Sequence, residues 1–93
     1  MRIRALVWKD VLVEKIVDKH DVCPDEVEEV VYEDSTKEVR RIGQERYGVF
    51  GQTEDGRYLF VVLDRDDDPG DFVVVTARDM TDKEKRAFRR QKR

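Results

Sequence analysis

A run of five apolar residues, Leu59–Leu63, constrains the fold most, because 44% of the 93 residues in this chain are charged. Side chains alternate between the two faces of a strand, so a run that is apolar throughout needs cover on both faces. The run therefore predicts a central strand, which we place at Arg57–Arg65. A chain of this length makes one domain, residues 1–93, whose small core must form around this strand.

Two further strands are expected beside the central one, at Arg46–Thr53 and Phe72–Arg78. Asp55-Gly56 separates the first pair and matches a two-residue hairpin turn, in which both residues need a positive φ. The loop Asp66–Asp71 is too acidic and too rich in turn residues to be buried. Its aspartates lack the spacing and the distal glutamate of a calcium-binding loop, so we expect a solvated turn.

The N-terminal part of the chain predicts a strand followed by a helix. Arg2–Trp8 is rich in β-favouring residues, and its terminal Trp8 is expected in the core. Leu12 and Ile16 lie one above the other on a helix that follows Asp10, a good helix N-cap.

A second helix is expected after a break at Asp21–Cys23. Pro24 suits the first helical position, and the carboxylates of Asp25-Glu26 favour the positive end of a helix. Val27 and Val30 begin the stripe that this helix buries. Because β-branched valines are mediocre helix formers, packing must hold the helix in place.

The C-terminal part predicts a third helix. Thr81–Glu84 has the pattern of a capping box, and a basic helix follows over residues 82–92 with Phe88 as an apolar anchor. The polar stretch Glu33–Glu45 is expected to be irregular, with a short strand at Val39–Ile42 left open. The element order is then β-α-α-β-β-β-α, an α+β fold with a small antiparallel sheet packed by two N-terminal helices and one C-terminal helix.

Charge is unevenly distributed along the chain. The net charge is −3, yet Lys83–Arg93 holds seven basic side chains and a single acidic one, Glu84. This asymmetry is typical of a protein that meets a charged partner on one side, while the acidic total argues against indiscriminate coating of nucleic acid. The charged composition and the lack of a long apolar run argue against a membrane protein and a signal peptide, so we expect a cytoplasmic location.

Cysteine and histidine are too scarce for several kinds of site. Cys23 is the single cysteine and His20 the single histidine, which excludes an internal disulfide and the usual zinc clusters. We therefore expect no metal and no cofactor. Cys23 has no second histidine to act as its base, so a catalytic thiol is disfavoured. For His20, a structural role at the end of the first helix is an alternative to a role in a functional site, because a charged imidazolium is favoured there.

The two-residue hairpin turn sets a register in which Arg46 faces Arg65. Like charges directly opposite each other destabilise a sheet. An anion between the two guanidinium groups would relieve the repulsion, and phosphate suits their planar donors. Alternatively, Glu45, Asp64 or Asp66 neutralises the pair locally.

The third arginine of interest, Arg78, ends the last predicted strand. In this register it lies near Tyr58, roughly 20 Å along the strands from Arg65. A compact small-molecule site could not use Arg65 and Arg78 together. A groove that follows an extended ligand could.

Taken in order along the chain, a set of motifs resembles the BrnT family, the toxin members of BrnT–BrnA type II toxin–antitoxin systems. The matching motifs are Trp8, Lys19-His20-Asp21-Val22, Pro24 with its Glu-rich helix, Arg46-x-x-x-x-Gly51, Gly56-Arg57-Tyr58-Leu59-Phe60-Val61-Val62, Thr76-Ala77-Arg78-Asp79-Met80 and Glu84-Lys85-Arg86. The resemblance implies a fold similar to RelE-type ribonucleases. It also implies a metal-independent endoribonuclease of RNA that is neutralised, in a hetero-oligomer, by a BrnA-like antitoxin that binds DNA.

The resemblance also suggests site residues. The expected catalytic set is His20, Arg46, Arg65 and Arg78, and the expected RNA- or partner-binding set is Tyr47, Tyr58, Glu84, Arg86, Arg89 and Arg90. Arginines can stabilise the charge on a phosphorane, and a histidine or carboxylate can move the proton. Tyrosines can stack on bases. The alternative function is a non-catalytic interaction module whose basic groove docks an antitoxin or another acidic partner.

Overall fold

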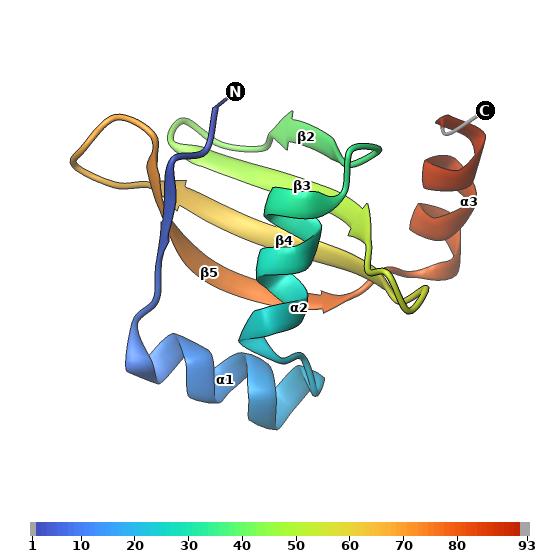
Figure 1. Ribbon diagram of the computed structural model, residues 1–93, viewed down its shortest axis with the longest axis horizontal. Helices are drawn as coiled ribbons and strands as arrows, with labels where there is room; N and C mark the ends of the chain where they lie inside the picture. The colour runs from blue at the N-terminus through green and yellow to red at the C-terminus, as the bar shows by residue number, and fades with distance from the viewer. Residues whose placement is uncertain (1, 92–93) are drawn as a thin grey trace.

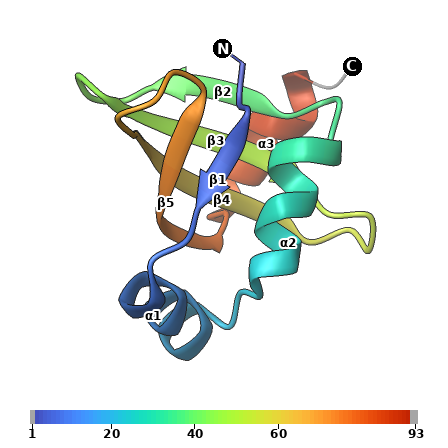
Figure 2. The same cartoon turned by 60° about the vertical axis from the view of Figure 1, so that its left-hand side comes forward.

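The computed structural model describes residues 2–91 as one sheet with helices on both of its faces (Figures 1 and 2). In chain order the elements are β1 (Ala5–Val7), α1 (Asp10–His20), α2 (Pro24–Glu28), the π-helical turn η1 (Glu29–Glu33), β2 (Glu38–Arg41), β3 (Arg46–Gln52), β4 (Tyr58–Arg65), β5 (Asp71–Asp79) and α3 (Asp82–Gln91). The predicted C-terminal helix is thus present; residue 92 of its expected range lies outside the described residues, as do residues 1 and 93.

β4 lies at the centre of the sheet, as the apolar run Leu59–Leu63 predicted. Within residues 2–91 the strand order is β1-β5-β4-β3-β2. The pairs β2–β3, β3–β4 and β4–β5 are antiparallel, and the optional short strand is present as β2. β1 pairs in parallel with β5, which makes the sheet mixed instead of purely antiparallel. The α+β class is confirmed.

One face of the sheet, which we call the core face, is covered by α1, α2 and η1 (Figure 2). Ile16 of α1 and Val27 and Val30 of the second helical segment are fully buried, as their spacing predicted. They pack with apolar side chains of the central strands, among them Leu59 and Val61. The sequence pattern thus identified the residues that hold the helices on the sheet.

The hairpin between β3 and β4 has the three-residue loop Glu54–Gly56 and not the predicted two-residue turn. The Thr53 N–H donates to the Arg57 carbonyl at 2.9 Å, and the Gly56 N–H donates to the Thr53 carbonyl at 2.9 Å. Gly56 has a φ of 97°, the left-handed conformation that closes such three-residue loops and that glycine adopts without strain. The loop therefore shifts the register of the hairpin by one residue.

This shift overturns the predicted opposition of two arginines. Arg46 pairs with Asp64, and Arg65 pairs with Phe72 of β5. Because side chains alternate along a strand, moving the register by one residue moves Arg65 to the other face relative to Arg46. The charge repulsion that the sequence suggested is therefore absent from this pairing.

The face opposite α1 and α2 carries α3 (Figure 2), and we call it the α3 face. By the register of the strands it carries Glu38, Arg40, Arg46, Gly48, Phe50, Tyr58, Phe60, Val62, Asp64, Thr76 and Arg78. The predicted capping box begins α3: the Glu84 N–H donates to the Thr81 hydroxyl at 3.2 Å, and Glu84 accepts from the Thr81 N–H at 2.8 Å. Phe88 is buried, as its role as anchor requires.

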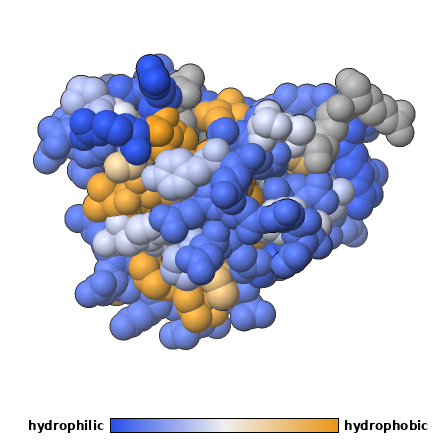
Figure 3. All heavy atoms as spheres, viewed as in Figure 1, coloured by the Kyte–Doolittle hydropathy of each residue, from blue (hydrophilic) through white to orange (hydrophobic). Residues whose placement is uncertain are grey.

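Hydrophilic side chains dominate the surface seen in Figure 3, with apolar patches beside β1 and over α1. Val11 and Val17 of α1 are 70% and 41% exposed. Trp8 packs against the core, as expected for the end of the first strand. Within residues 2–91, no helix has both the length and the apolar character needed to cross a bilayer.

Candidate nucleic-acid interface

Arg46 and Arg65 lie at the end of the β3–β4 hairpin that is opposite its loop, and neighbouring carboxylates bind both of them. Arg46 donates twice to Asp64, from Nε to Oδ1 at 2.7 Å and from Nη2 to Oδ2 at 2.9 Å. Arg65 lies 3.2 Å from Glu45, measured from Nε to Oε2. The hydrogen bonds from Arg46 hold the pKa of Asp64 below its ordinary value. The alternative in which neighbouring carboxylates neutralise these arginines is thus confirmed.

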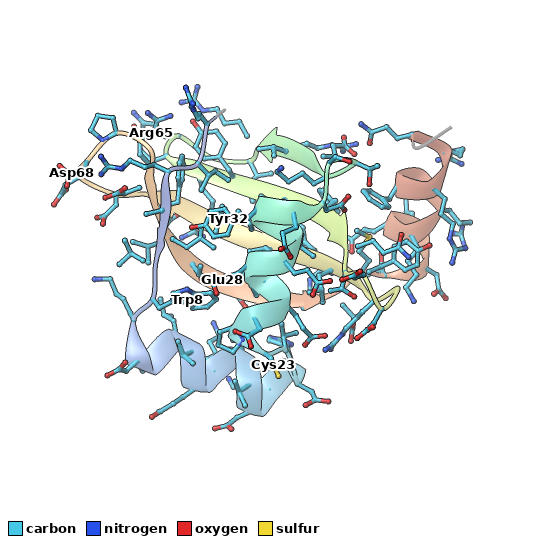
Figure 4. The ribbon with its side chains drawn as sticks, in the orientation of Figure 1. Trp8, Cys23, Glu28, Tyr32, Arg65 and Asp68 are labelled. Carbon is cyan, nitrogen blue, oxygen red and sulfur yellow. The ribbon has the colours of Figure 1, made fainter. Side chains whose placement is uncertain are left out.

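Arg65 and Tyr47 lie on the core face, away from Arg46. Nη2 of Arg65 donates to the Tyr47 hydroxyl at 2.8 Å, and its guanidinium lies 5.9 Å from the centroid of the Phe72 ring. Figure 4 shows Arg65 at the end of the sheet near the loop that bears Asp68, far from α3. The structure therefore does not bring these two predicted site residues together with Arg46.

Arg78 forms a second bidentate ion pair, this time with α3. It donates to the two carboxylate oxygens of Glu84 at 2.8 and 3.1 Å, and to the Asp79 carbonyl at 3.0 Å. Its guanidinium lies 4.6 Å from the centroid of the Phe60 ring. The hydrogen bonds from Arg78 lower the pKa of Glu84, so this carboxylate is ionised at neutral pH. Two predicted site residues thus form one unit.

Aromatic rings extend this unit across the sheet. The Phe60 and Phe50 rings lie 4.6 Å apart between centroids at an angle of 31°, and the Arg40 guanidinium lies 5.6 Å from the Phe50 centroid. Gly48 makes room for this row, because a Cβ there would lie 2.7 Å from Cε1 of Phe60. Rings and guanidinium groups of this kind are the groups on which unpaired bases stack.

A cleft with a volume of about 360 Å³ lies between this row and α3. Its apolar side chains are Phe50, Ala87 and Phe88, and its polar ones are Glu38, Arg40, Thr81, Lys83 and Glu84. Glu84 both lines the cleft and binds Arg78, so the ion pair lies at the edge of an apolar pocket. Aromatic groups, cations and an ionised carboxylate meet here.

The remaining predicted binding residues lie at or on α3. Arg89 donates from Nε to the Tyr58 hydroxyl at 3.2 Å, and its guanidinium lies 5.0 Å from the centroid of the Tyr58 ring. The Tyr58 ring also packs edge-on against Phe88, with centroids 6.0 Å apart. Arg86 and Arg90 are on the same helix, and both are exposed. Tyr58 therefore supports α3 on the sheet.

His20 ends α1, which covers the core face, whereas Arg78 and Glu84 belong to the α3 face. Its carbonyl accepts from Nη2 of Arg57 at 3.2 Å. Arg57 also donates to Asp79 at 2.7 and 3.2 Å and to Glu26 at 2.9 Å, and so links the helices to β5. This environment is compatible with the structural alternative for His20.

A larger cleft, of about 460 Å³, lies elsewhere, between η1 and the β3–β4 hairpin. The charged residues of the described chain that line it are Glu29, Glu33, Asp34 and Glu54, all acidic. Such a lining repels a polyanion, so this cleft is a poorer candidate for binding nucleic acid than the cleft beside α3, although it is larger. Within residues 2–91, no three histidine, cysteine, aspartate or glutamate side chains gather closely enough to hold a metal ion.

Comparison with solved structures places the fold. The chain is similar to the crystal structure of the Brucella abortus ribonuclease toxin BrnT, with a TM-score of 0.67 and 13% sequence identity. The match covers 83% of this chain and 96% of that one. No family model matches the sequence, and no curated protein matches it. The predicted likeness to BrnT is confirmed at the level of the fold.

Proposed function

We propose, from the shared BrnT fold, that this chain is the toxin of a type II toxin–antitoxin pair and cleaves RNA without a metal ion. The observation that carries the proposal is the Arg78–Glu84 pair at the edge of the cleft below α3. A guanidinium can stabilise the charge that develops in metal-free cleavage of RNA, and an ionised carboxylate can accept the proton.

In this mechanism Glu84 accepts the proton of a ribose 2′-hydroxyl, and the 2′-oxygen attacks the adjacent phosphorus. The bond from phosphorus to the 5′-oxygen breaks, which leaves a 2′,3′-cyclic phosphate on one fragment. The departing oxygen takes a proton from water and becomes the 5′-hydroxyl of the other. Arg78 stabilises the charge on the phosphorane, because its five N–H donors exceed its three bonds to Glu84 and Asp79.

Arg46 extends the interface along the sheet. It lies on the same face as Arg78, four residues further along the strands, which is roughly 13 Å, and two strands across the sheet, which is roughly a further 10 Å. Such a separation exceeds the spacing of adjacent phosphates, so the two arginines would bind non-adjacent phosphates of an extended RNA strand. The basic residues Arg86, Arg89 and Arg90 of α3 add positive charge beside this path.

The partner in this proposal is a BrnA-like, DNA-binding antitoxin that covers the α3 face in a cytoplasmic hetero-oligomer. The second candidate function, a non-catalytic interaction module, is favoured by the ion pairs Arg46–Asp64 and Arg78–Glu84. These pairs neutralise the arginines within the chain and could serve docking alone.

Controlled expression of the chain, with and without a BrnA-like antitoxin from the same genome, separates the two candidates. The toxin proposal predicts growth arrest and degraded total RNA, both relieved by the antitoxin. Glu84→Gln and Arg78→Gln should each restore growth. Arg4→Gln is the matched control, because it breaks a similar arginine–aspartate pair at the β1 edge. If total RNA stays intact when the wild-type protein is expressed, the toxin proposal is refuted and the interaction module is the function that remains.

A further inference from the structure

The cleft below α3 has a polar rim that the cleavage chemistry does not use. Glu38 and Arg40 stand two residues apart on β2 and therefore point to the same face. They form an ion pair, and the Arg40 guanidinium lies over the Phe50 ring with 5.6 Å to its centroid. Both residues line the cleft, as does Phe50. An acceptor and a planar donor are thus held beside an aromatic surface.

This combination matches the hydrogen-bonding groups of guanine. A carboxylate accepts from the N1–H and N2–H groups of guanine, and a guanidinium donates to its O6 and N7 atoms. Adenine has an amino donor in place of O6 and a ring acceptor in place of N1–H. It would therefore set a donor against the donor Arg40 and an acceptor against the acceptor Glu38. Each of the two side chains has hydrogen-bonding capacity beyond their mutual bond.

A base bound in the cleft would lie next to the phosphate that reacts. Glu84 lines the cleft and binds Arg78, so a base in the cleft lies beside the proposed cleavage site. Phe50 and Phe88 supply the apolar contacts for the ring, and Lys83 lies at the same opening. A duplex cannot place a base there without unstacking it, which favours unpaired RNA.

We propose that the cleft below α3 binds one unpaired guanine base of RNA beside the phosphate held by Arg78. The proposal rests on the proposed function in that the ligand is RNA. It adds a base preference and assigns Glu38, Arg40 and Phe50 as the residues that determine it.

Binding of labelled oligonucleotides to the full chain tests this pocket without requiring cleavage. The probes are two fluorescein-labelled pentanucleotides, UUGUU and UUAUU, with 2′-O-methyl groups throughout to prevent cleavage. Fluorescence anisotropy should show roughly tenfold tighter binding of the guanine probe, within the range of one good base contact. Glu38→Gln should reduce this preference to about twofold, because the amide presents a donor as well as an acceptor.

Phe50→Leu should weaken binding of both probes roughly tenfold by removing the stacking surface. Glu33→Gln, on the acidic cleft of the other side, is the matched control and should retain the guanine preference. Thermal unfolding of each variant establishes that it is folded. Equal binding of the two probes by the wild-type chain would overturn the proposal.

Cleavage of an unmodified RNA by the same preparations distinguishes this inference from the proposed function. Cleavage without a guanine preference in the binding assay would refute the pocket and retain the ribonuclease. A guanine preference that depends on Glu38, without cleavage, would support the pocket and refute the catalytic role.

Discussion

Arg78 and Glu84 determine how the proposed activity depends on pH. The hydrogen bonds from Arg78 place the pKa of Glu84 below its ordinary value of 4.5. A proton acceptor must be ionised, so kcat/KM should fall only as the pH drops through this lowered pKa and should be constant from about pH 5 to pH 8. In Arg78→Gln the remaining activity should fall at a higher pH, because the charge that lowers the pKa is lost.

A pH profile of RNA cleavage measures this directly. A proton acceptor that titrates near neutral pH, as histidine side chains ordinarily do, would change the rate severalfold between about pH 5 and 7.5. Such a profile would contradict the role of Glu84.

Gly48 controls the position of the aromatic row. In Gly48→Ala the new Cβ would lie 2.7 Å from Cε1 of Phe60, so the ring must move. We expect a loss of about 1–3 kcal/mol in the free energy of unfolding, typical of overpacking, together with weaker RNA binding. Urea denaturation and anisotropy with the guanine probe measure the two effects. If Gly48→Ala changed neither stability nor RNA binding, Gly48 would not be needed to position the Phe50 and Phe60 rings.

Individual residues were predicted more successfully than their partners. The resemblance identified Arg78 and Glu84 separately, but their ion pair depends on the reversal of the chain at Thr81, which a list of site residues does not contain. Phe50 and Phe60 were missed because the assumed register placed Phe50 opposite Val61. With the observed register the two phenylalanines are directly paired, and an aromatic pair on a half-exposed face is a recognisable signal.

At the scale of elements, the β3–β4 hairpin shows why local signals are insufficient. Asp55-Gly56 is compatible with a two-residue turn and with the end of a three-residue loop. The Thr53 hydroxyl favours the longer loop by accepting from the Arg57 N–H at 3.0 Å, a contact that the turn motif does not encode. The parallel pairing of β1 with β5 joins segments far apart in sequence and has no local signal at all. The central strand and the helices, by contrast, follow from periodicity and capping.

The corrected register makes a prediction about two arginines of similar exposure. Arg46 and Arg65 are 48% and 46% exposed at their side chains, but they lie on opposite faces. Arg46→Gln should weaken binding of an RNA probe severalfold, and Arg65→Gln should have a smaller effect. Anisotropy titrations of both variants provide the comparison. A larger effect of Arg65→Gln would place the RNA on the core face.

Arg57 connects α1, α2 and β5 and should contribute to stability. Its side chain is 25% exposed and binds Asp79 and Glu26. Arg57→Met should lower the free energy of unfolding by about 1–3 kcal/mol, because it leaves the half-buried carboxylate of Glu26 and the carbonyls of His20 and Asp21 without their donor. Arg65→Met is the control: Arg65 and its partner Glu45 are 46% and 62% exposed at their side chains, and such surface pairs contribute little. Equal effects in urea denaturation would argue against this role for Arg57.

At the scale of the whole molecule, the charges are unevenly distributed. The cleft beside η1 is lined by carboxylates, whereas α3 carries five basic side chains and two acidic ones. This uneven distribution explains how a chain of net charge −3 could bind a polyanion. Only a few phosphates can be contacted, so the logarithm of the RNA affinity should fall with the logarithm of salt concentration with a slope of roughly −1 to −3.

Titrations between about 50 and 200 mM salt measure this slope. A slope near zero would exclude phosphate contacts. A much steeper slope would require a basic surface larger than the α3 face.

The most direct test of the central claim is the fate of a 5′-labelled RNA incubated with the purified chain in EDTA. The account predicts fragments that end in 2′,3′-cyclic phosphates, with cleavage at least about 100-fold slower in Glu84→Gln, as expected on loss of a general base. RNA that stays intact with the wild-type chain, or cleavage that is unaffected by Glu84→Gln, would contradict it.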